Sequence, residues 1–428
     1  MKTPVDRKAV PRLTGFGDMC FSGPETVETS SGIPLKVLRN DSSDAVRLSV
    51  IWRFGTITAE NYEAALIMPM LLEDGTTSVG GDEITESLDF NGASFTAQAG
   101  TYSTRAVLTA ISGNYVGLLP LVRDMIANPS FPEELLRRKA QSARTRIAVN
   151  RTKLSNIAQI NNRIQLWGEN NPLSRIVDLD RLGSITRDEI LRTHNEIINM
   201  RPEVWVAGNL DDGLISATVS FVDSLPFNGE NAGIKEMEIF VPEPPSFREI
   251  KADGKSQSYI LATLPAILPE NPDFYSLTMA VTHLGGYFGS RLNKNIREEK
   301  GLTYGIGCTM NISNGVSTIA ISCQTLSGNE NTIVSEIKRE MRRLAENPPS
   351  RSEMRAASLS VEGELAAILD SVYSMSEMMI NNRFNLLPEN DFESRLESAR
   401  NVTSDKIAEV AGKYLDPDKL TITVVKGG

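Results

Sequence analysis

The chain has 428 residues, which is enough for two or more domains with a large buried core. It carries 44 Lys and Arg against 54 Asp and Glu, and this formal charge of −10 argues against a general nucleic-acid-binding protein. The 3 cysteines, Cys20, Cys308 and Cys323, lie far apart and form no CxxC pair. We therefore expect buried thiols rather than a disulfide framework or a cysteine zinc site.

Neither end of the chain shows a targeting or membrane segment. No apolar run typical of a secretory signal opens the sequence, and no window approaches about 18 consecutive apolar residues. Residues 1–28 are polar, with recurring Pro and Gly, and predict an extended arm. We expect a soluble protein with no membrane or nucleic-acid partner. It would lie in the cytoplasm by default, or in the periplasm or an organelle if a leader has been removed.

The first half of the chain predicts strands and helices in alternation. Residues 33–39 and 45–54 alternate apolar and polar side chains around the polar stretch 40–44, which predicts two antiparallel strands joined by a turn. A helix is predicted at 62–72, interrupted by Pro69, and another at 82–90. Thr186, with Glu189 three positions on, predicts the start of a helix that runs to about residue 199. The remaining predicted elements are strands at 94–99, 104–112 and 203–208, and helices at 116–127 and 132–167.

The second half repeats the first. The segment 185–190 is echoed by 402–407, 201–206 by 416–422, and 127–129 by 346–348, each about 217 residues later. Residues 223–256 are rich in Pro, Gly and charge and predict a linker. The sequence therefore predicts a duplicated chain with units at 1–222 and 257–428. Each unit is expected to be an α+β fold of about 215 residues, with helices on one face of a mostly antiparallel sheet.

Four short motifs carry a resemblance to a known family. They lie at 71–77 (LLEDGTT) and 84–94 (ITESLDFNGAS) in the first half, and at 289–292 (GSRL) and 296–304 (IREEKGLTY) in the second. With the duplication, they resemble the pitrilysin/insulinase superfamily of zinc peptidases, and more closely the subunits of mitochondrial processing peptidase and its two-chain bacterial relatives. The resemblance implies that such a chain forms half of a clam-shell chamber.

The zinc site of that family is missing from this sequence. Active members carry H-x-x-E-H on a helix, in which the histidines bind zinc and the glutamate is the general base. The resemblance places these positions at Leu66, Pro69 and Met70, and the third ligand near Thr145. None of these side chains is a zinc ligand or a base, and residues 135–168 contain no carboxylate. We expect no zinc and no hydrolytic activity in this chain, with zinc held by a partner subunit.

The only two histidines, His194 and His283, lie far from these positions. We expect them to have surface or capping roles.

Arg297 and Tyr304 are the candidate substrate-binding residues. In the family, an Arg and a Tyr in R-x-x-x-G-L-x-Y spacing touch the substrate backbone and the developing oxyanion, and the resemblance gives these residues that role. A guanidinium offers forked donors to a carbonyl, and a tyrosine hydroxyl can donate to a negative oxygen. Gly301 between them would allow a sharp turn from helix to strand. A purely structural role for both side chains is the alternative.

Two other features have competing interpretations. The run 285–290 (GGYFGS) lacks the G-x-x-x-x-G-K-S/T pattern of a phosphate loop and favours a tight packing turn. The helix at 132–167 carries eight Lys and Arg side chains and, after residue 134, no acid. It is either a solvated basic face or a positive wall that faces a chamber or an acidic partner.

Two functions from different classes fit the sequence. In the first, the chain is a catalytically inactive subunit of a heterodimeric zinc metalloendopeptidase. It contributes chamber wall and substrate contacts, and a homologous H-x-x-E-H subunit cuts the peptide. In the alternative, the chain is a non-enzymatic scaffold or peptide-binding protein of the same fold, which includes the case of a homodimer. The sequence alone does not choose between them.

Overall fold

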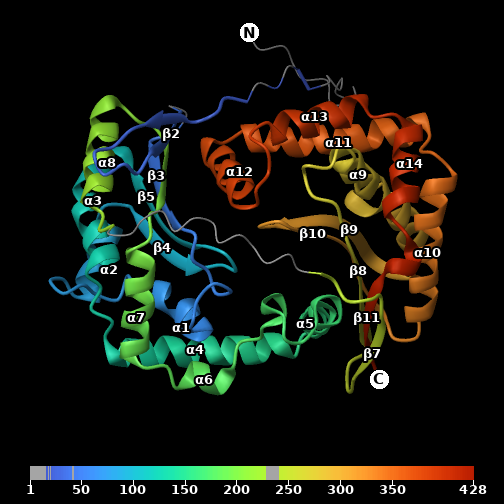
Figure 1. Cartoon of the computed structure of the whole chain (residues 1–428), viewed down its shortest axis with the longest axis horizontal. Coiled ribbons are helices and arrows are strands. Elements are labelled where there is room, and N and C mark those ends of the chain that lie inside the picture. Colours follow the sequence, from blue (N-terminus) through green and yellow to red (C-terminus); the bar gives the residue numbers. More distant parts are fainter. Residues whose placement is uncertain (1–15, 18, 20, 41–42, 228–240) are drawn as a thin grey trace, which may run out of the picture.

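Two mixed β-sheets with their helices make up the molecule (Figure 1). The structure is a computed structural model of the chain, and it describes residues 16–17, 19, 21–40, 43–227 and 241–428. Most of the predicted N-terminal arm, residues 1–15, lies outside the described residues, as does Cys20. Within the described part, no helix is both long and apolar enough to cross a bilayer. Cys308 and Cys323 are buried free thiols, as predicted, and burial raises the pKa of both.

The first sheet has six strands in the order β1-β2-β6-β3-β5-β4. These are β1 (Glu25–Val27), β2 (Leu35–Arg39), β3 (Ala45–Trp52), β4 (Ser94–Ala99), β5 (Thr104–Ile111) and β6 (Glu203–Gly208). The helices of this half are α1 (Tyr62–Ile67), η1 (Met68–Leu71), α2 (Gly81–Phe90), α3 (Ser112–Ala127), α4 (Glu133–Arg151), α5 (Leu154–Trp167), η2 (Pro172–Ser174), α6 (Leu179–Gly183), α7 (Arg187–Ile198) and α8 (Asp212–Ser224).

The second sheet has five strands in the order β7-β11-β8-β10-β9. These are β7 (Phe247–Ala252), β8 (Gln257–Pro265), β9 (Thr303–Ser313), β10 (Val316–Leu326) and β11 (Thr421–Gly427). The helices are α9 (Phe274–Val281), η3 (Thr282–Gly286), η4 (Asn293–Glu299), α10 (Glu330–Glu346), α11 (Arg351–Leu369), α12 (Val372–Phe384), α13 (Asp391–Asn401), α14 (Ser404–Tyr414) and η5 (Pro417–Lys419). Strand β7 falls inside the range 223–256 that the composition favoured as a linker.

Both sheets place the last strand of their half between two consecutive early strands. Strand β6 pairs parallel with β2 and antiparallel with β3, and β11 pairs parallel with β7 and antiparallel with β8. This shared order confirms the duplicated α+β fold. The strands predicted at 33–39 and 45–54 are present and run antiparallel, but they do not pair with each other, because β6 lies between them. Alternation reveals which faces of a strand are buried, but it does not reveal which strand lies alongside.

The helix predicted at 132–167 is two helices. Helix α4 ends at Arg151, Lys153 is extended at φ −78° and ψ 134°, and α5 begins at Leu154. The break contains neither Pro nor Gly, and its one helix-end signal, Arg151 in the last turn, does not stand out in a helix that is basic along its length. After the break, α5 leaves its own half and packs on the second sheet, where Ala158 contacts Leu261 and Val425.

In the same way, helix α12 of the second half packs on the first sheet. Val372, Met379, Ile380 and Phe384 of α12 pack with Leu38, Ile51, Trp205 and Ala207, which line the face of the first sheet away from that half's main core. Figure 1 shows α12 lying between the two sheets, and α5 at the lower end of the second sheet. Each half thus covers one face of its sheet with its own helices and part of the other face with a helix from the opposite half.

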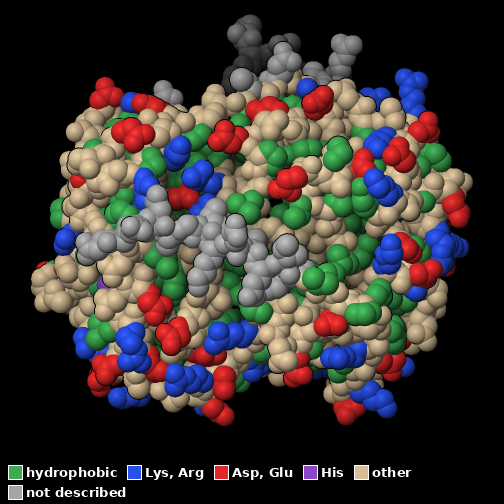
Figure 2. Space-filling view, viewed as in Figure 1, with side chains coloured by type: hydrophobic (Ala, Val, Ile, Leu, Met, Phe, Trp, Pro, Cys, Tyr) green, Lys and Arg blue, Asp and Glu red, His purple; other side chains and the backbone are tan. Residues whose placement is uncertain are grey.

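Charged side chains of both signs cover the surface. Figure 2 shows Lys and Arg interspersed with Asp and Glu over the face in view. Several basic side chains of α4 are paired: Lys139 with Glu73 and Asp74, and Arg144 with Asp180. The side chain of Arg151 donates to the backbone oxygen of Val177. Three of the eight basic side chains at 132–167 thus have partners within the chain.

Candidate functional site

The four positions assigned to the missing zinc site lie on α1, η1 and α4. Leu66 is half-buried near the end of α1, Pro69 is buried in η1, and Met70 is half-buried beside it. Thr145 is exposed on α4, where its hydroxyl donates to the carbonyl oxygen of Gln141 at 3.0 Å. Among the residues that the structure describes, no group of three or more His, Cys, Asp or Glu side chains is placed to hold a metal ion.

A lysine ammonium group occupies part of this region. Nζ of Lys139 on α4 donates to the backbone oxygen of Met70 and lies 3.1 Å from Glu73 Oε1 and 2.9 Å from Asp74 Oδ1. Burial raises the pKa of Asp74, although Lys139 opposes that shift. The lysine thus ties η1 to α4 by charge. A fixed ammonium has no open coordination position and cannot activate water as zinc does.

Both histidines are buried, so a surface role is wrong for both, but His194 has the other predicted role, a capping contact with a last-turn carbonyl of α3. His194 is 7% exposed, and its Nε2 lies 2.8 Å from the carbonyl oxygen of Ile126. His283 is 2% exposed, and its Nε2 has no hydrogen-bond partner. Burial lowers the pKa of both side chains, that of His283 to about 4. Two isolated histidines gave no periodic signal from which their burial could be predicted.

Arg297 and Tyr304 lie on consecutive elements of the second half. Arg297 belongs to η4, a π-helix, and Tyr304 is the second residue of β9. Such wide turns are rare and are frequently found at functional sites. Gly301 between them has φ +62°, a left-handed conformation that glycine adopts at little cost. The predicted sharp turn between helix and strand is therefore confirmed.

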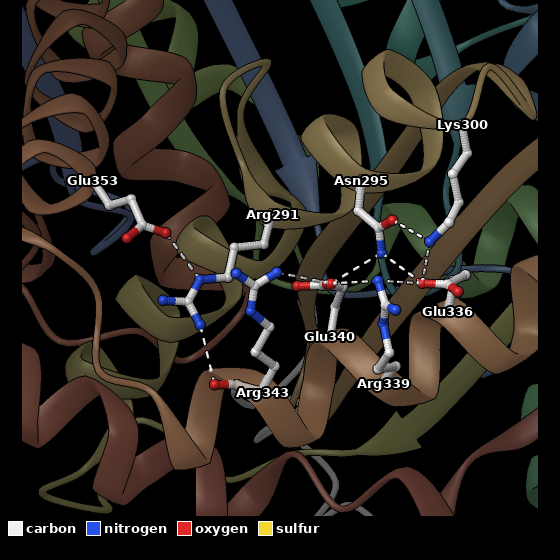
Figure 3. Close-up of polar contacts among 8 residues, drawn as sticks. All are labelled: Arg291, Asn295, Lys300, Glu336, Arg339, Glu340, Arg343 and Glu353. Carbon is white, nitrogen blue, oxygen red and sulfur yellow. Dashed lines mark hydrogen bonds and ion pairs between the residues drawn. The ribbon is translucent and has the colours of Figure 1, made fainter.

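A buried polar network holds η4 against α10 (Figure 3). The amide of Asn295 donates to Glu336 at 2.7 Å and to Glu340 at 2.9 Å, and Lys300 lies 2.7 Å from Glu336. Burial alone would raise the pKa of Glu336, but hydrogen bonds from Lys300 and Asn295 outweigh it and keep this pKa low. Arg339 and Arg343 also reach the two carboxylates. The network fixes the π-helix that carries Arg297. The sequence did not predict this network, because its members come from two separate elements, η4 and α10.

The backbone of β9 is bulged at Tyr304. Ile306 pairs with Cys323 and Thr303 with Thr325, so Tyr304 and Gly305 together oppose the single residue Gln324. A bulge of this kind redirects a side chain. The side chain of Tyr304 is 95% exposed.

Arg297 has an aromatic neighbour that sequence reasoning missed. Its guanidinium carbon lies 3.9 Å from the centre of the Phe288 ring, and Phe288 is itself 66% exposed. Stacking on an aromatic face restricts a guanidinium while leaving its N–H groups free to donate. Arg297 and Tyr304 make no hydrogen bond with each other in the described structure. An aromatic residue inside the glycine-rich run 285–290 was the one available sign of an exposed ring.

The glycine-rich run itself is a packing element. A Cβ on Gly285 would lie 2.5 Å from Cys308 Cβ, so the helix can approach β9 only with glycine at this position. This contact confirms the packing role predicted for the run.

Strand β9 is an edge of its sheet. Among the described strands it pairs with β10 alone. Next to Tyr304, part of its backbone has side-chain partners: Ile306 O accepts from Asn293 Nδ2 at 2.9 Å, and Gly305 N donates to Thr303 Oγ1 at 3.2 Å. A Cβ on Gly305 or Gly307 would meet nothing within 4 Å, so this stretch is open in space. Where no side chain occupies the backbone groups, an extended peptide can add to the free side of the strand. The exposed Tyr304 and the half-buried Arg297 thus lie close in sequence at an edge strand suited to a peptide backbone.

Comparisons with known proteins agree with this picture. Residues 184–359 match the family model described as the peptidase M16 inactive domain. The chain is 23% identical over 376 residues to an uncharacterized zinc protease of Rickettsia felis, a match covering 86% of this chain and 90% of that protein. It is 18% identical over 365 residues to the non-peptidase homolog YmxG of Helicobacter pylori, covering 84% of each.

A solved structure shares the fold. The peptidase M16 inactive domain from Pseudomonas fluorescens superposes with a TM-score of 0.84 at 19% identity, over 94% of this chain and 98% of that one. Together with the family match, it confirms the resemblance to the pitrilysin-type zinc peptidases. The family model that this chain matches describes an inactive domain, and the matched residues 184–359 do not include Leu66, Pro69, Met70 or Thr145.

Proposed function

We propose that this chain is the non-catalytic subunit of a two-chain zinc endopeptidase. In this proposal it supplies one wall of a chamber and holds an extended peptide, and a homologous chain with H-x-x-E-H binds zinc and cuts. The observation that carries the proposal is the exposed Tyr304 on the bulge of an edge strand, with Arg297 held against the Phe288 ring seven residues before it. The replacement of the zinc ligands by Leu66, Pro69 and Met70 supports the division of roles.

The chemistry assigned to the two side chains follows from their donors. The peptide pairs with the free side of β9 through its backbone. Arg297, restricted by Phe288, donates to a peptide carbonyl oxygen. The hydroxyl of Tyr304 donates to the oxyanion that forms when water, activated in the partner subunit, attacks the scissile carbonyl.

The test is reconstitution with a homologous chain that contains H-x-x-E-H, sought first in an adjacent reading frame. We expect the purified chain alone to hold no stoichiometric zinc by elemental analysis and to cleave no peptide. The assembled pair should cleave. Arg297→Ala combined with Tyr304→Phe should lower kcat/KM about a hundred-fold, the scale of one lost oxyanion donor. Lys294→Ala, an exposed change on the same π-helix, is the matched control and should have little effect. Stoichiometric zinc with peptidase activity in the lone chain would overturn the proposal.

The second candidate is a scaffold or peptide-binding protein that takes no part in chemistry. The description of the Helicobacter pylori relative as a non-peptidase homolog favours it. Under this alternative, the Arg297/Tyr304 double variant leaves the activity of an assembled peptidase unchanged. Mass measurement by light scattering, with and without the H-x-x-E-H chain, separates a homodimer from a mixed pair.

A further inference from the structure

A cavity of about 650 Å³ lies where α12 crosses the first sheet. One wall is Arg47 of β3, and the other is α12 with the residue before it, including Ser371, Tyr373, Ser374 and Glu377. The cavity therefore lies between the two halves of the chain. None of its residues belongs to the Arg297 and Tyr304 site.

Arg47 in this cavity makes no hydrogen bond with any described residue. Its Nε is buried without a partner, and its Nη1 lies 3.9 Å from Glu377 Oε1, too far for a hydrogen bond. The guanidinium lies 4.9 Å from the centre of the Tyr373 ring, and the Tyr373 hydroxyl donates to Ala45 at 2.8 Å, which fixes that ring. The Arg47 side chain is only 30% exposed. A largely buried guanidinium normally has acceptors for its five N–H donors.

Neighbouring charges leave the positive charge of Arg47 in excess. The carboxylate of Glu377 is engaged by Arg105, with Arg105 Nη1 2.5 Å from Glu377 Oε2. Glu203, the other carboxylate at this crossing, is shared by Arg53 and Arg383. Arg47 and Glu377 are the charged residues that line the cavity, and because Arg105 of the neighbouring strand engages Glu377, Glu377 does not fully offset Arg47. A carboxylate bound at Arg47 would complete the charge balance there.

We infer that this cavity binds a carboxylate of the peptide that the chain holds. The planar fork of Arg47 suits a carboxylate, which can accept two N–H bonds at once. Helix α12 begins at the cavity with Ser371 as its cap, and the N-terminal end of a helix favours a negative group. The exposed hydroxyl of Ser374 offers a further, neutral donor. The carboxylate is either the C-terminus of the peptide or an Asp or Glu side chain.

The path of β9 leads from the first site toward this cavity. Strand β9 runs from Thr303, beside Tyr304, to Ser313, and at its far turn Asn314 N lies 3.4 Å from Asn385 Oδ1, at the C-terminal end of α12. A peptide paired with β9 is thus led toward α12. The inference rests on the proposed function for the peptide, but the carboxylate site can be tested separately.

The test compares four fluorescently labelled peptides of one extended sequence, measured by anisotropy with the full chain. One has a free C-terminus and no internal acid, and one is its amide. The other two are amides with a single internal Glu or Gln. We expect a carboxylate to tighten binding about ten-fold or more, the scale of one charge-assisted hydrogen-bonded pair. Preference for the free acid alone identifies a C-terminus, and preference for Glu over Gln identifies a side chain.

Variants then assign the preference to Arg47. Arg47→Met should remove it, Arg47→Lys should keep part of it, and Arg342→Met, which deletes a distant surface arginine, should leave it intact. Equal binding within both pairs, free acid with amide and Glu with Gln, would overturn the carboxylate site and leave the proposed function standing. Persistence of the preference in Arg47→Met would also overturn it.

A second measurement covers the case in which no long peptide binds, which is the failure of the proposed function. Phenylglyoxal modifies accessible arginines, and mass spectrometry of the unmutated chain reports the extent at Arg47. An acetylated tripeptide acid at millimolar concentration should slow modification of Arg47, while its amide should not. Equal modification with acid and amide would overturn the carboxylate site. This result does not depend on whether Arg47 variants fold.

Discussion

Of the two histidines, His283 has the environment that more strongly opposes charge. Its ring is 2% exposed, Nε2 has no hydrogen-bond partner, and burial lowers its pKa to about 4, against the smaller opposing effect of Glu353. The positive charge of Arg291 lowers the pKa of His283 further and so also disfavours its protonation. The folded chain therefore keeps His283 neutral at pH values where the unfolded chain would protonate it.

This arrangement predicts acid sensitivity with a defined window. As pH falls from about 6.5 to about 4, the unfolded chain binds a proton at His283 that the folded chain does not, so stability declines over that range, by up to about 3 kcal/mol at its lower end. His283→Leu should flatten the dependence of the melting temperature on pH within this window, relative to the unmodified protein. Identical pH profiles for the two proteins would contradict the assignment.

Lys139 is expected to contribute measurably to stability through its ion pairs with Asp74 and Glu73. Its ammonium is the partner of Asp74, whose Oδ2 is buried without a hydrogen bond and whose side chain is 12% exposed. Lys139→Met should cost about 1–3 kcal/mol, because it leaves Asp74 and Glu73 without their cation. Lys139→Met combined with Asp74→Asn should cost less than the sum of the two single changes, as measured by a double-mutant cycle of urea unfolding. Simple additivity would show that the pair is not coupled.

At the scale of elements, the turn from η4 to β9 decides where the candidate site points. A π-helix, a left-handed glycine and a β-bulge follow one another within residues 293–305. The hydrogen bonds of Asn295 tie the π-helix to α10. Each of these irregularities changes the direction of the chain. Together they leave Arg297 against Phe288 and Tyr304 open to solvent.

Substitutions at Gly301 test whether the backbone or the available space fixes this turn. A Cβ there would meet nothing within 4 Å, so any cost arises from φ +62° alone. Gly301→Val should destabilise by about 1–2 kcal/mol, whereas Gly301→Asn should cost clearly less, because Asn tolerates the left-handed region. Urea unfolding of the two variants measures the difference. Equal losses would show that the turn is not held at this φ.

Local signals in the sequence predicted many of these elements. The capping box of Thr186 and Glu189 is present at the start of α7, and Gly301 turns the chain as expected. The break at Lys153 could not be predicted, because it depends on α5 packing against the second sheet. Phe288 and the partners of Asn295 were missed for a similar reason: their roles depend on contacts with η4 and α10 that adjacent residues do not encode.

At the scale of the whole molecule, the two halves are joined by an exchange of helices. Helix α5 of the first half inserts Asn162 into the second sheet, where it donates to Thr421 and accepts from Thr263. Helix α12 of the second half packs on the first sheet and is tied there by Arg105 with Glu377 and by Arg383 with Glu203. The internal repeat predicted two like units, but nothing in the repeat indicated that each unit would lend a helix to the other.

The exchange predicts that neither half is stable alone. Residues 1–227 expressed separately would leave Leu38, Ile51 and Trp205 without α12, and residues 241–428 would leave Leu261 and Val425 without α5. We expect each fragment to bind a hydrophobic dye and to lack a cooperative melting transition. The two fragments expressed together should purify as one complex that melts cooperatively. A separate fragment that melts as sharply as the full chain would contradict this expectation.

The same helix exchange means that, during synthesis, the first sheet is made long before the helix that covers it. The sheet residues that α12 covers are complete once β6 has been made, but α12 emerges only about 160 residues later, or roughly ten to thirty seconds at bacterial and eukaryotic elongation rates. During that interval Trp205 and its neighbours lie bare on a nascent first half. A chaperone that shields this surface at the ribosome would act on the one step of folding that the chain cannot complete by itself until its second half arrives.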